Sequence, residues 1–220
     1  MVTLLVVGGS GFVGREVCRL AVRDGHGVRS VSRRGRPDVD APWADRVSWT
    51  SADVFRPNAW RDRLAGVDAV VHSVGTLSEE PTDGTTFERV NGDSAILAAL
   101  EAERAGVEAF VFLSSAVKPP GVRHAYLSAK RRAEESVADL DPDVVTLRPG
   151  PVYGPGEPHF PAPVGTLLRL VDSIPPVAER LGEVRPLPVE TVARAAYRSA
   201  TDPTAGERML DVEGIRRRGR

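Results

Sequence analysis

The sequence is poor in cysteine and has no long apolar run. Its single cysteine, Cys18, excludes an internal disulfide and a metal site built from several thiolates, and no metal site is expected. No apolar run approaches the ~18 residues of a membrane-spanning helix. Because an apolar strand is expected within a few residues of Met1, no targeting peptide is expected, and the expected location is cytoplasmic.

Net charge is also nearly absent, since 29 basic and 30 acidic side chains leave a formal charge of −1. This balance provides no overall field that attracts nucleic acid or an anionic membrane, so neither is expected as a partner. Lysine is scarce, because Lys118 and Lys130 are the only two. A lysine that falls where a known type of site requires one therefore carries more weight than in a lysine-rich chain.

What the sequence does contain is an alternation of strands and helices. Strands are predicted at residues 2–7, 28–32, 47–52, 69–73, 110–114 and 144–147, and helices at 12–24, 60–64, 87–105 and 126–140. The first strand is an apolar run that ends in glycine, which is typical of a buried parallel strand. The alternation predicts an α/β fold, a Rossmann-type doubly wound parallel sheet with right-handed βαβ units.

The pattern changes after Arg148. Residues 149–163 are crowded with proline and glycine, which predicts a loop. Beyond it we expect helices at 166–171 and 189–200, a last strand at 209–212 and a frayed basic tail at 216–220. We therefore predict an NAD(P)-binding Rossmann domain at 1–154 and a short C-terminal extension at 155–220, packed on the same domain on its substrate side.

A glycine-rich turn, Val6-Val7-Gly8-Gly9-Ser10-Gly11-Phe12-Val13-Gly14, joins the first strand to the first helix. Gly8 permits a tight turn, Gly11 lets the backbone approach a pyrophosphate, and Gly14 lets helix and strand pack closely. The helix N-terminus offers free N–H groups and the positive end of its dipole to the phosphates. A turn without a ligand is the alternative, but the strand–turn–helix context favours a dinucleotide site.

The end of the second strand bears on the choice of cofactor. An NAD site usually has an acidic residue about 20 residues beyond the glycines, which holds the ribose 2′-hydroxyl. Here Ser32-Arg33-Arg34 offers two guanidinium groups to a 2′-phosphate and no carboxylate to repel it. NADP(H) is therefore favoured over NAD(H), and two solvated arginines are the alternative. Asp53, which closes the third strand, is expected to accept a hydrogen bond from adenine or else to cap a turn.

Tyr126-Leu127-Ser128-Ala129-Lys130 places a tyrosine and one of the two lysines four residues apart, on one face of a helix. A tyrosine can donate a proton to a carbonyl as hydride arrives. A nearby ammonium is expected to lower the pKa of the phenol and to hold the nicotinamide ribose. Ser114 and Ser115 end the preceding strand, where a hydroxyl can orient the substrate oxygen.

These motifs, in this order, resemble the extended short-chain dehydrogenases/reductases. The resemblance covers residues 1–154, and 186–195 (PLPVETVARA) also resembles the family's return to the sheet. It rests on Gly8 to Gly14, Asp53, His72-Ser73-Val74-Gly75, Asn91, Ser114, Tyr126, Lys130 and Arg148 to Gly154. It implies a dinucleotide site formed by Gly8, Ser10, Gly11, Phe12, Val13, Gly14, Ser32, Arg33, Arg34, Asp53, Val54, Ser73, Val74, Gly75, Tyr126, Lys130, Pro149 and Val152, with catalysis by Ser114 or Ser115, Tyr126 and Lys130.

Within the family, an atypical branch is the most similar. Residues 31–35, 49–57 and 70–75 resemble mitochondrial members associated with coenzyme Q biosynthesis and, more distantly, the NADPH-binding accessory subunit of respiratory complex I. In that branch nucleotide binding is clearer than turnover. The resemblance implies a quinone-related or respiratory role, with a homo-oligomer or a protein of that pathway as a candidate partner.

The chain departs from the family pattern after the fifth strand. Val117-Lys118-Pro119-Pro120 replaces the usual Val-Tyr, and the distance from serine to tyrosine is shorter, so either Ser114 or Ser115 is the candidate hydroxyl. The C-terminal part is short for a sugar-nucleotide substrate. Two other polar positions are expected to be structural: His72 as a core histidine and Glu134-Glu135 as a solvated helix face.

Three hypotheses follow. The first is an NADP(H)-dependent oxidoreductase that acts on an unidentified small molecule, with Tyr126 as acid and base. The second is a nucleotide-binding scaffold or assembly factor of quinone or respiratory metabolism, with little turnover. The third and weakest is a sugar-nucleotide epimerase or dehydratase. The intact Tyr126–Lys130 pair favours the first over the second.

Overall fold

A seven-stranded sheet forms the centre of the computed structural model, which describes residues 1–156, 162–174, 178, 180–202 and 207–220. The order is β3-β2-β1-β4-β5-β6-β9, and every neighbouring pair is parallel. The strands are β1 (Thr3–Val7), β2 (Gly27–Ser32), β3 (Val47–Ser51), β4 (Ala69–His72), β5 (Ala109–Leu113), β6 (Asp143–Leu147) and β9 (Met209–Leu210). The order reverses between β1 and β4, which confirms the predicted doubly wound Rossmann fold.

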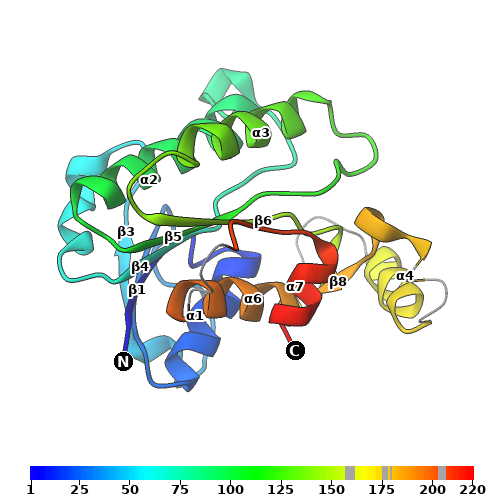
Figure 1. Cartoon of the computed structure of the whole chain (residues 1–220), viewed down its shortest axis with the longest axis horizontal. Helices are drawn as coiled ribbons and strands as arrows, with labels where there is room; N and C mark the ends of the chain where they lie inside the picture. The colour runs from blue at the N-terminus through cyan, green and yellow to red at the C-terminus, as the bar shows by residue number, and fades with distance from the viewer. Residues whose placement is uncertain (157–161, 175–177, 179, 203–206) are drawn as a thin grey trace.

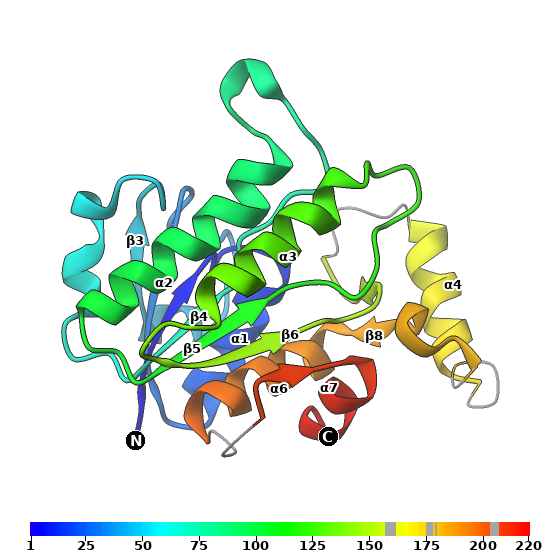
Figure 2. The ribbon, with the colours of Figure 1, turned by 45° about the horizontal axis from the view of Figure 1, so that its top comes forward.

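Helices cover both faces of the sheet. α2 (Ser94–Arg104) and α3 (Ala125–Val137) lie on one face, and α1 (Phe12–Arg23), α6 (Val189–Thr201) and α7 (Val212–Arg218) lie on the other (Figure 1). α4 (Ala162–Asp172) stands at one end of the molecule, near the small sheet of β7 (Val152–Tyr153) and β8 (Leu187–Pro188) (Figure 2). Short 3₁₀ segments are η1 (Ala44–Arg46), η2 (Pro57–Ala59), η3 (Arg61–Leu64), η4 (Pro81–Asp83) and η6 (Gly182–Val184). Within the described part of the chain, no helix is both long enough and apolar enough to cross a membrane.

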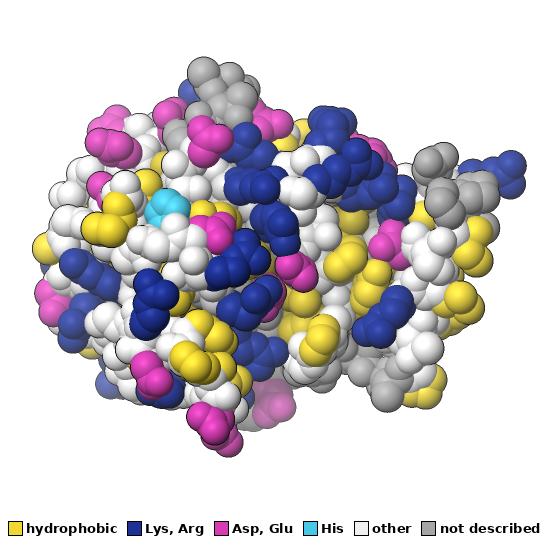
Figure 3. Space-filling model, turned by 90° about the horizontal axis from the view of Figure 1, so that it is seen from below, with side chains coloured by type: hydrophobic (Ala, Val, Ile, Leu, Met, Phe, Trp, Pro, Cys, Tyr) yellow, Lys and Arg dark blue, Asp and Glu magenta, His cyan; other side chains and the backbone are white. Residues whose placement is uncertain are grey.

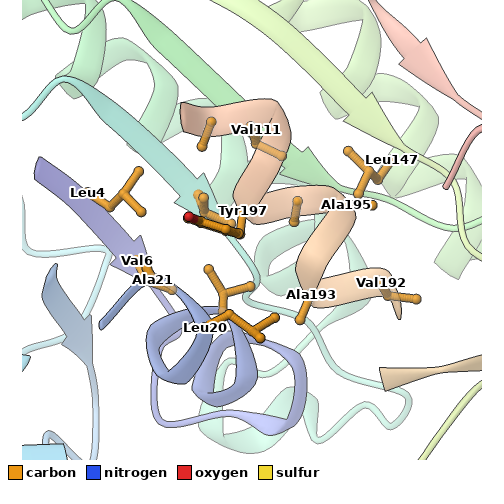
Figure 4. Close-up of a cluster of buried hydrophobic side chains, with 14 of the residues drawn as sticks. Leu4, Val6, Leu20, Ala21, Val111, Leu147, Val192, Ala193, Ala195 and Tyr197 are labelled. Carbon is orange, nitrogen blue, oxygen red and sulfur yellow. The ribbon is translucent and has the colours of Figure 1, made fainter. Parts of the chain in front are cut away.

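The larger hydrophobic core joins the C-terminal segment to the first βαβ unit. α6 contributes Val192, Ala193 and Ala195, and in Figure 4 Ala193 lies beside Leu20 of α1. Leu4 of β1 belongs to the same cluster, and all five side chains are fully buried. The small alanine side chains let the two helices approach closely, so α6 replaces solvent over the sheet with packed apolar surface.

The long helix predicted at 87–105 is divided in the structure. Residues Glu88–Asp93 form a π-helix, and the regular helix α2 begins only at Ser94. Asn91 lies within the π-helical turn, is fully buried, and binds both backbone groups of Thr76. Wide turns of this kind redirect a side chain without ending a helix. Hydrophobic spacing does not reveal them, because the apolar face continues through the segment.

The prediction of a frayed tail at 216–220 is wrong. α7 occupies Val212–Arg218, and Asp211 caps it by accepting the N–H of Gly214 at 2.7 Å. Ile215 is fully buried, and Arg198 donates to the carbonyls of Arg218 and Arg220 at 2.8 and 2.5 Å. A cap, one buried side chain and two tertiary hydrogen bonds thus hold a segment whose composition alone indicated a solvated end.

The arginines concentrate on the face formed by α1, α6 and α7, where dark blue side chains spread over the surface in Figure 3. Arg19 pairs with Glu16 at 2.5 Å, and Arg216 pairs with Glu213 at 2.8 Å, each within one helical turn. Partly exposed pairs of this spacing stabilise a helix by only about 0.2–0.5 kcal/mol. The stability of this face therefore comes from the apolar layer beneath it.

The contact between the first turn of α1 and the end of β1 predicts opposite effects for two helical glycines. A Cβ atom at Gly14 would lie 2.4 Å from the carbonyl oxygen of Gly8, whereas a Cβ atom at Gly165 in α4 meets nothing within 4 Å. Gly14→Ala should lower the free energy of unfolding by about 1–3 kcal/mol. Gly165→Ala, the matched control, should raise it by about 0.5–1 kcal/mol. Urea unfolding of both variants measures this, and an unaffected Gly14→Ala would contradict the close packing.

Candidate dinucleotide and active site

The glycine-rich turn lies at the switch point of the sheet, between β1 and β4. Gly8 has φ of +92°, its N–H donates to the carbonyl of Val31 at 2.8 Å, and its own carbonyl accepts the N–H of Gly11 at 2.9 Å. The same carbonyl lies against Gly14, where a Cβ atom would also meet Ser73 Oγ at 2.5 Å. Gly8 and Gly14 are therefore required by the chain's own packing.

Gly11 is not required by that packing. Its φ of −77° and ψ of 176° are open to any residue, and a Cβ atom there would approach only the carbonyl oxygen of Gly8, at 3.1 Å. α1 begins after Gly11 with no side-chain cap and no acidic residue in its first turn, which includes Phe12 and Val13. Uncapped N–H groups beside a residue without a side chain fit a dinucleotide pyrophosphate.

Gly9 was not among the predicted site residues, yet it is as constrained as its neighbours. A Cβ atom there would lie 2.3 Å from Ser30 Oγ and 3.0 Å from Cys18 Sγ. This glycine lets β1, β2 and α1 meet beneath the turn. The doubled glycine in the sequence was the available signal, and it reports internal packing rather than a ligand contact.

The segment predicted to bind the adenosine end lies at the tip of β2. Ser10 Oγ donates to Ser32 Oγ at 2.9 Å, and Ser32 Oγ donates to the carbonyl of Gly35 at 3.1 Å. Arg33 and Arg34 are exposed, and neither forms an ion pair with any residue that the structure describes. Arg33 lies near enough to Asp83 to lower the pKa of that carboxyl, and both guanidinium groups are accessible to a phosphate.

Asp53 forms a turn at the end of β3. One of its carboxylate oxygens accepts the N–H of Phe55 at 3.0 Å, and its carbonyl accepts the N–H of Arg56 at 2.9 Å. The next residue, Val54, is buried in the core on the α2 side. The capping role expected as an alternative is thus present, and the contact to adenine stays a prediction.

The loop after β4 connects the glycine turn to Tyr126 and Lys130, the predicted catalytic pair. Ser73 Oγ donates to the carbonyl of Val7 at 3.1 Å, and Val74 follows it, half-buried. Gly75 is exposed, and a Cβ atom there would lie 3.1 Å from Asn91 Oδ1 and 3.9 Å from Lys130 Nζ. The chain therefore passes from the phosphate turn to Lys130 along the C-terminal edge of the sheet.

Two further predicted contacts follow β6 on the same edge. The carbonyl of Pro149 accepts the N–H of Ala116 at 2.8 Å, which ties the loop after β6 to the loop after β5. Val152 is half-buried in β7 and pairs with Leu187 of β8. Tyr153 is buried, and its hydroxyl donates to Asp172 of α4 at 2.9 Å, so this tyrosine binds α4.

Tyr126 and Lys130 both lie on the buried face of α3. Lys130 Nζ donates to the carbonyl of Leu113 at 2.9 Å and lies 5.9 Å from the centre of the Tyr126 ring. Phe87 packs edge-on against that ring, with 5.8 Å between the ring centres. The pair therefore lies among largely apolar side chains at the end of β5.

The two serines after β5 point to different partners. The Ser115 hydroxyl lies near enough to Tyr126 to lower the pKa of the phenol, and it donates to the carbonyl of Val117 at 2.7 Å. Ser114 Oγ donates to Glu134, which is buried and paired with Arg148 at 2.5 Å. The prediction that Glu134 belongs to a solvated helix face is wrong, because these partners hold it beneath the active site.

The expected fall in the pKa of the Tyr126 phenol does not occur in the protein alone. Burial raises that pKa and exceeds the opposing effects of the Ser115 hydroxyl and the Arg131 guanidinium. Burial also lowers the pKa of Lys130 to about 8, against the attraction of Glu134. Lys130 is thus a partly desolvated ammonium whose charge is sensitive to its neighbours.

His72 is the last residue of β4 and lies near Lys130. It is fully buried between Phe110 and Phe112, and its Nε2 lies 3.0 Å from Ser94 Oγ. Burial lowers its pKa to about 3, so the imidazole stays neutral at physiological pH. The prediction of a core histidine agrees with these contacts.

A glycine turn at the switch point of a doubly wound sheet defines the class of this chain, the Rossmann-type dinucleotide-binding proteins. The sequence matches the NAD dependent epimerase/dehydratase family over residues 4–174, and the chain belongs to that family.

Three relatives and one solved structure illustrate this membership. An uncharacterized chloroplastic protein of Arabidopsis thaliana is 35% identical over 84% of this chain, ceramide reductase of Caulobacter vibrioides 32% over 97%, and MIOREX complex component 2 of Saccharomyces cerevisiae 31% over 60%. The chain spans 62–65% of the length of these relatives. The structure of MoeE5 in complex with UDP-glucuronic acid and NAD covers 96% of this chain, with 76% of MoeE5 matched, a TM-score of 0.70 and 21% identity.

Because a side chain at Gly11 would contact little of the chain itself, we predict that a variant there folds but loses dinucleotide binding. Gly11→Val should keep the unfolding temperature near that of the parent protein, because only one atom of the chain lies near the new Cβ. The valine side chain should fill the space where the pyrophosphate meets the backbone, so calorimetry should detect no dinucleotide binding. Undiminished affinity in a folded variant would contradict this placement of the phosphates.

Proposed function

We propose that this protein is an NADP(H)-dependent reductase of a carbonyl compound. The observation that carries the proposal is the placement of Tyr126 and Lys130 on one face of α3, with Ser115 near the phenol and Lys130 near Gly75, at the sheet edge that also bears the glycine turn. Ligands of doubly wound sheets lie in the crevice beyond this edge. A relative named ceramide reductase supports the reductase class.

Each residue has a chemical role in this proposal. Tyr126 donates the proton to the carbonyl oxygen, and the Ser115 hydroxyl orients the same oxygen. Lys130 holds the ribose and places a positive charge near the phenol. Bound nicotinamide supplies the hydride. Phe87 and the other apolar neighbours keep water away from the phenol, so its proton passes to the substrate.

The glycine turn and the tip of β2 hold the rest of the cofactor in this proposal. Gly11 and the first turn of α1 bind the pyrophosphate, Arg33 and Arg34 bind the 2′-phosphate, and Asp53 contacts the adenine. The unpaired state of the two arginines supports NADP(H), and NAD(H) is the alternative. A cytoplasmic location and a homo-oligomer stay predictions.

A nucleotide-binding component of a larger assembly is the second candidate function. A relative named MIOREX complex component 2 favours it, and a partner in quinone or respiratory metabolism remains the predicted setting. In that function the dinucleotide stabilises the fold, and Tyr126 need not act as a proton donor. Sugar-nucleotide epimerase or dehydratase chemistry stays the weakest candidate.

The exposed arginines predict a preference for the phosphorylated cofactor. NADPH should bind at least about tenfold more tightly than NADH, since each charge-assisted contact is worth roughly 1.5–3 kcal/mol. Replacing both Arg33 and Arg34 by alanine should remove the preference. Arg36→Ala is the matched control, because Arg36 is already paired with Asp45 at 2.7 Å. Calorimetry with both cofactors measures the ratio, and equal affinities in the parent protein would refute NADP(H) selectivity.

The catalytic assignment predicts a split between binding and turnover. Tyr126→Phe should keep NADPH affinity but lower turnover ~10²–10⁴-fold, because a general acid is lost while packing changes little. Lys130→Met should lower both, since the lysine has two roles. Reduction of a panel of quinones and carbonyl compounds measures turnover, with Tyr197→Phe on the opposite face as control. If Tyr126→Phe is fully active, the assignment is wrong; if nothing is reduced while NADPH binds tightly, the assembly function is favoured.

A further inference from the structure

The residue after Lys130 on α3 is a second cation that contacts the catalytic segment. Arg131 Nη2 donates to the carbonyl of Ser115 at 2.8 Å, and Nη1 lies 3.3 Å from Ser114 Oγ. One guanidinium thus binds both residues that follow β5. Because Ser115 faces Tyr126, this contact fixes the part of the backbone that positions the orienting hydroxyl.

Glu134 anchors this guanidinium. Arg131 Nη1 donates to Glu134 Oε1 at 2.6 Å, and Arg148 Nε reaches both carboxylate oxygens at 3.2 and 3.1 Å. The Glu134 side chain is 9% exposed, whereas those of Arg131 and Arg148 are 31% and 33% exposed. A buried carboxylate between two half-buried guanidinium groups joins α3, the end of β5 and the end of β6 into one unit.

We propose that Arg131, anchored by Glu134, is a positioning residue that fixes Ser115 and supplies a second positive charge to the Tyr126 phenol beside Lys130. The proposal rests on the reductase function proposed above. It extends that function to a residue outside the Tyr126–Lys130 pair, and it gives the buried Glu134 a part in the active site.

The charge near Tyr126 has more than one source. The Arg131 guanidinium lowers the pKa of the phenol, and the same guanidinium lowers the pKa of Lys130. Lys130 loses its proton at about pH 8, whereas a guanidinium stays charged throughout the working range. Arg131 therefore maintains a positive charge near the phenol under conditions in which the ammonium is partly neutral.

Other side chains also surround Tyr126 and Lys130. Ser115 approaches from the end of β5, and Phe87 packs against the ring from the segment before α2. The neutral imidazole of His72 lies on the β4 side of Lys130. Glu79 is paired with Arg123 at 2.9 Å in the loop before α3. None of these places a permanent positive charge on the phenol as Arg131 does.

The test is a titration of Tyr126 followed by tyrosine-selective ¹³C NMR in the full chain. The protein has three tyrosines, so the signal lost in Tyr126→Phe identifies Tyr126, and Tyr153 and Tyr197 serve as internal controls. Arg131→Met should raise the pKa of Tyr126 by about half to one unit. Arg131→Lys, which keeps the charge, should leave the pKa near its value in the parent protein.

The kinetic test uses the panel compound that NADPH reduces fastest. Loss of the Lys130 proton and loss of the phenol proton both lower activity at alkaline pH, and Arg131 lowers both pKa values, so Arg131→Met should move the alkaline limb upward. Both Arg131 variants should lower kcat about tenfold, because a single ammonium cannot replace the fork that holds Ser115 and Glu134 together. Arg132→Met is the matched control, since Arg132 pairs with Glu88 and Asp93 instead.

The outcomes separate this inference from the proposed function. Equal Tyr126 titrations in the parent protein and Arg131→Met would overturn the inference, as would an equal shift in Arg132→Met. If the titration moves as expected but no compound is reduced, the reductase function fails while the electrostatic coupling stands. If Tyr126→Phe abolishes turnover and Arg131→Met changes neither kcat nor the alkaline limb, the inference alone fails.

Discussion

The close approach of Gly8 and Gly14 is the constraint on which the rest of the molecule depends. The carbonyl of Gly8 lies where a side chain at Gly14 would be, and Ser73 closes the same space from β4. This contact sets the angle at which α1 leaves the sheet. α6 packs on α1, so the position of the C-terminal helices follows from two missing side chains near the start of the chain.

A second constraint is the free energy required to bury the Lys130 ammonium at the end of β5. Lys130 is almost fully buried, and the only hydrogen bond it donates among the described residues goes to the carbonyl of Leu113. An ammonium in such a place keeps its proton only while anionic groups remain near it. Glu134 lies one helical turn further on, and the two guanidinium groups around it hold it in place. The groups that set the charge of Lys130 thus extend beyond Tyr126 to the ends of β5 and β6.

The sheet and the glycine turn could be predicted because the sequence patterns that indicate them are local. Short apolar runs, spacing of helical faces and glycines at fixed offsets all act over a few residues. Glu134 could not be interpreted in this way, because its partners Arg148 and Ser114 come from two different strand ends. The choice between Ser114 and Ser115 had the same difficulty, since it depends on which hydroxyl faces α3. The helix at 212–218 depended on a tertiary contact with Arg198 that no local pattern contains.

The sheet is completed late during synthesis, because β9 pairs with β6. α6 covers β4 and β5, so residues 189–210 finish a sheet whose first strand is made nearly two hundred residues earlier. A nascent chain that has reached β6 still exposes one apolar face of its sheet and an unpaired strand edge. Contacts of such sequence separation slow folding and prolong exposure of these surfaces. Until residues 189–210 have been made, the growing chain is therefore most vulnerable to aggregation.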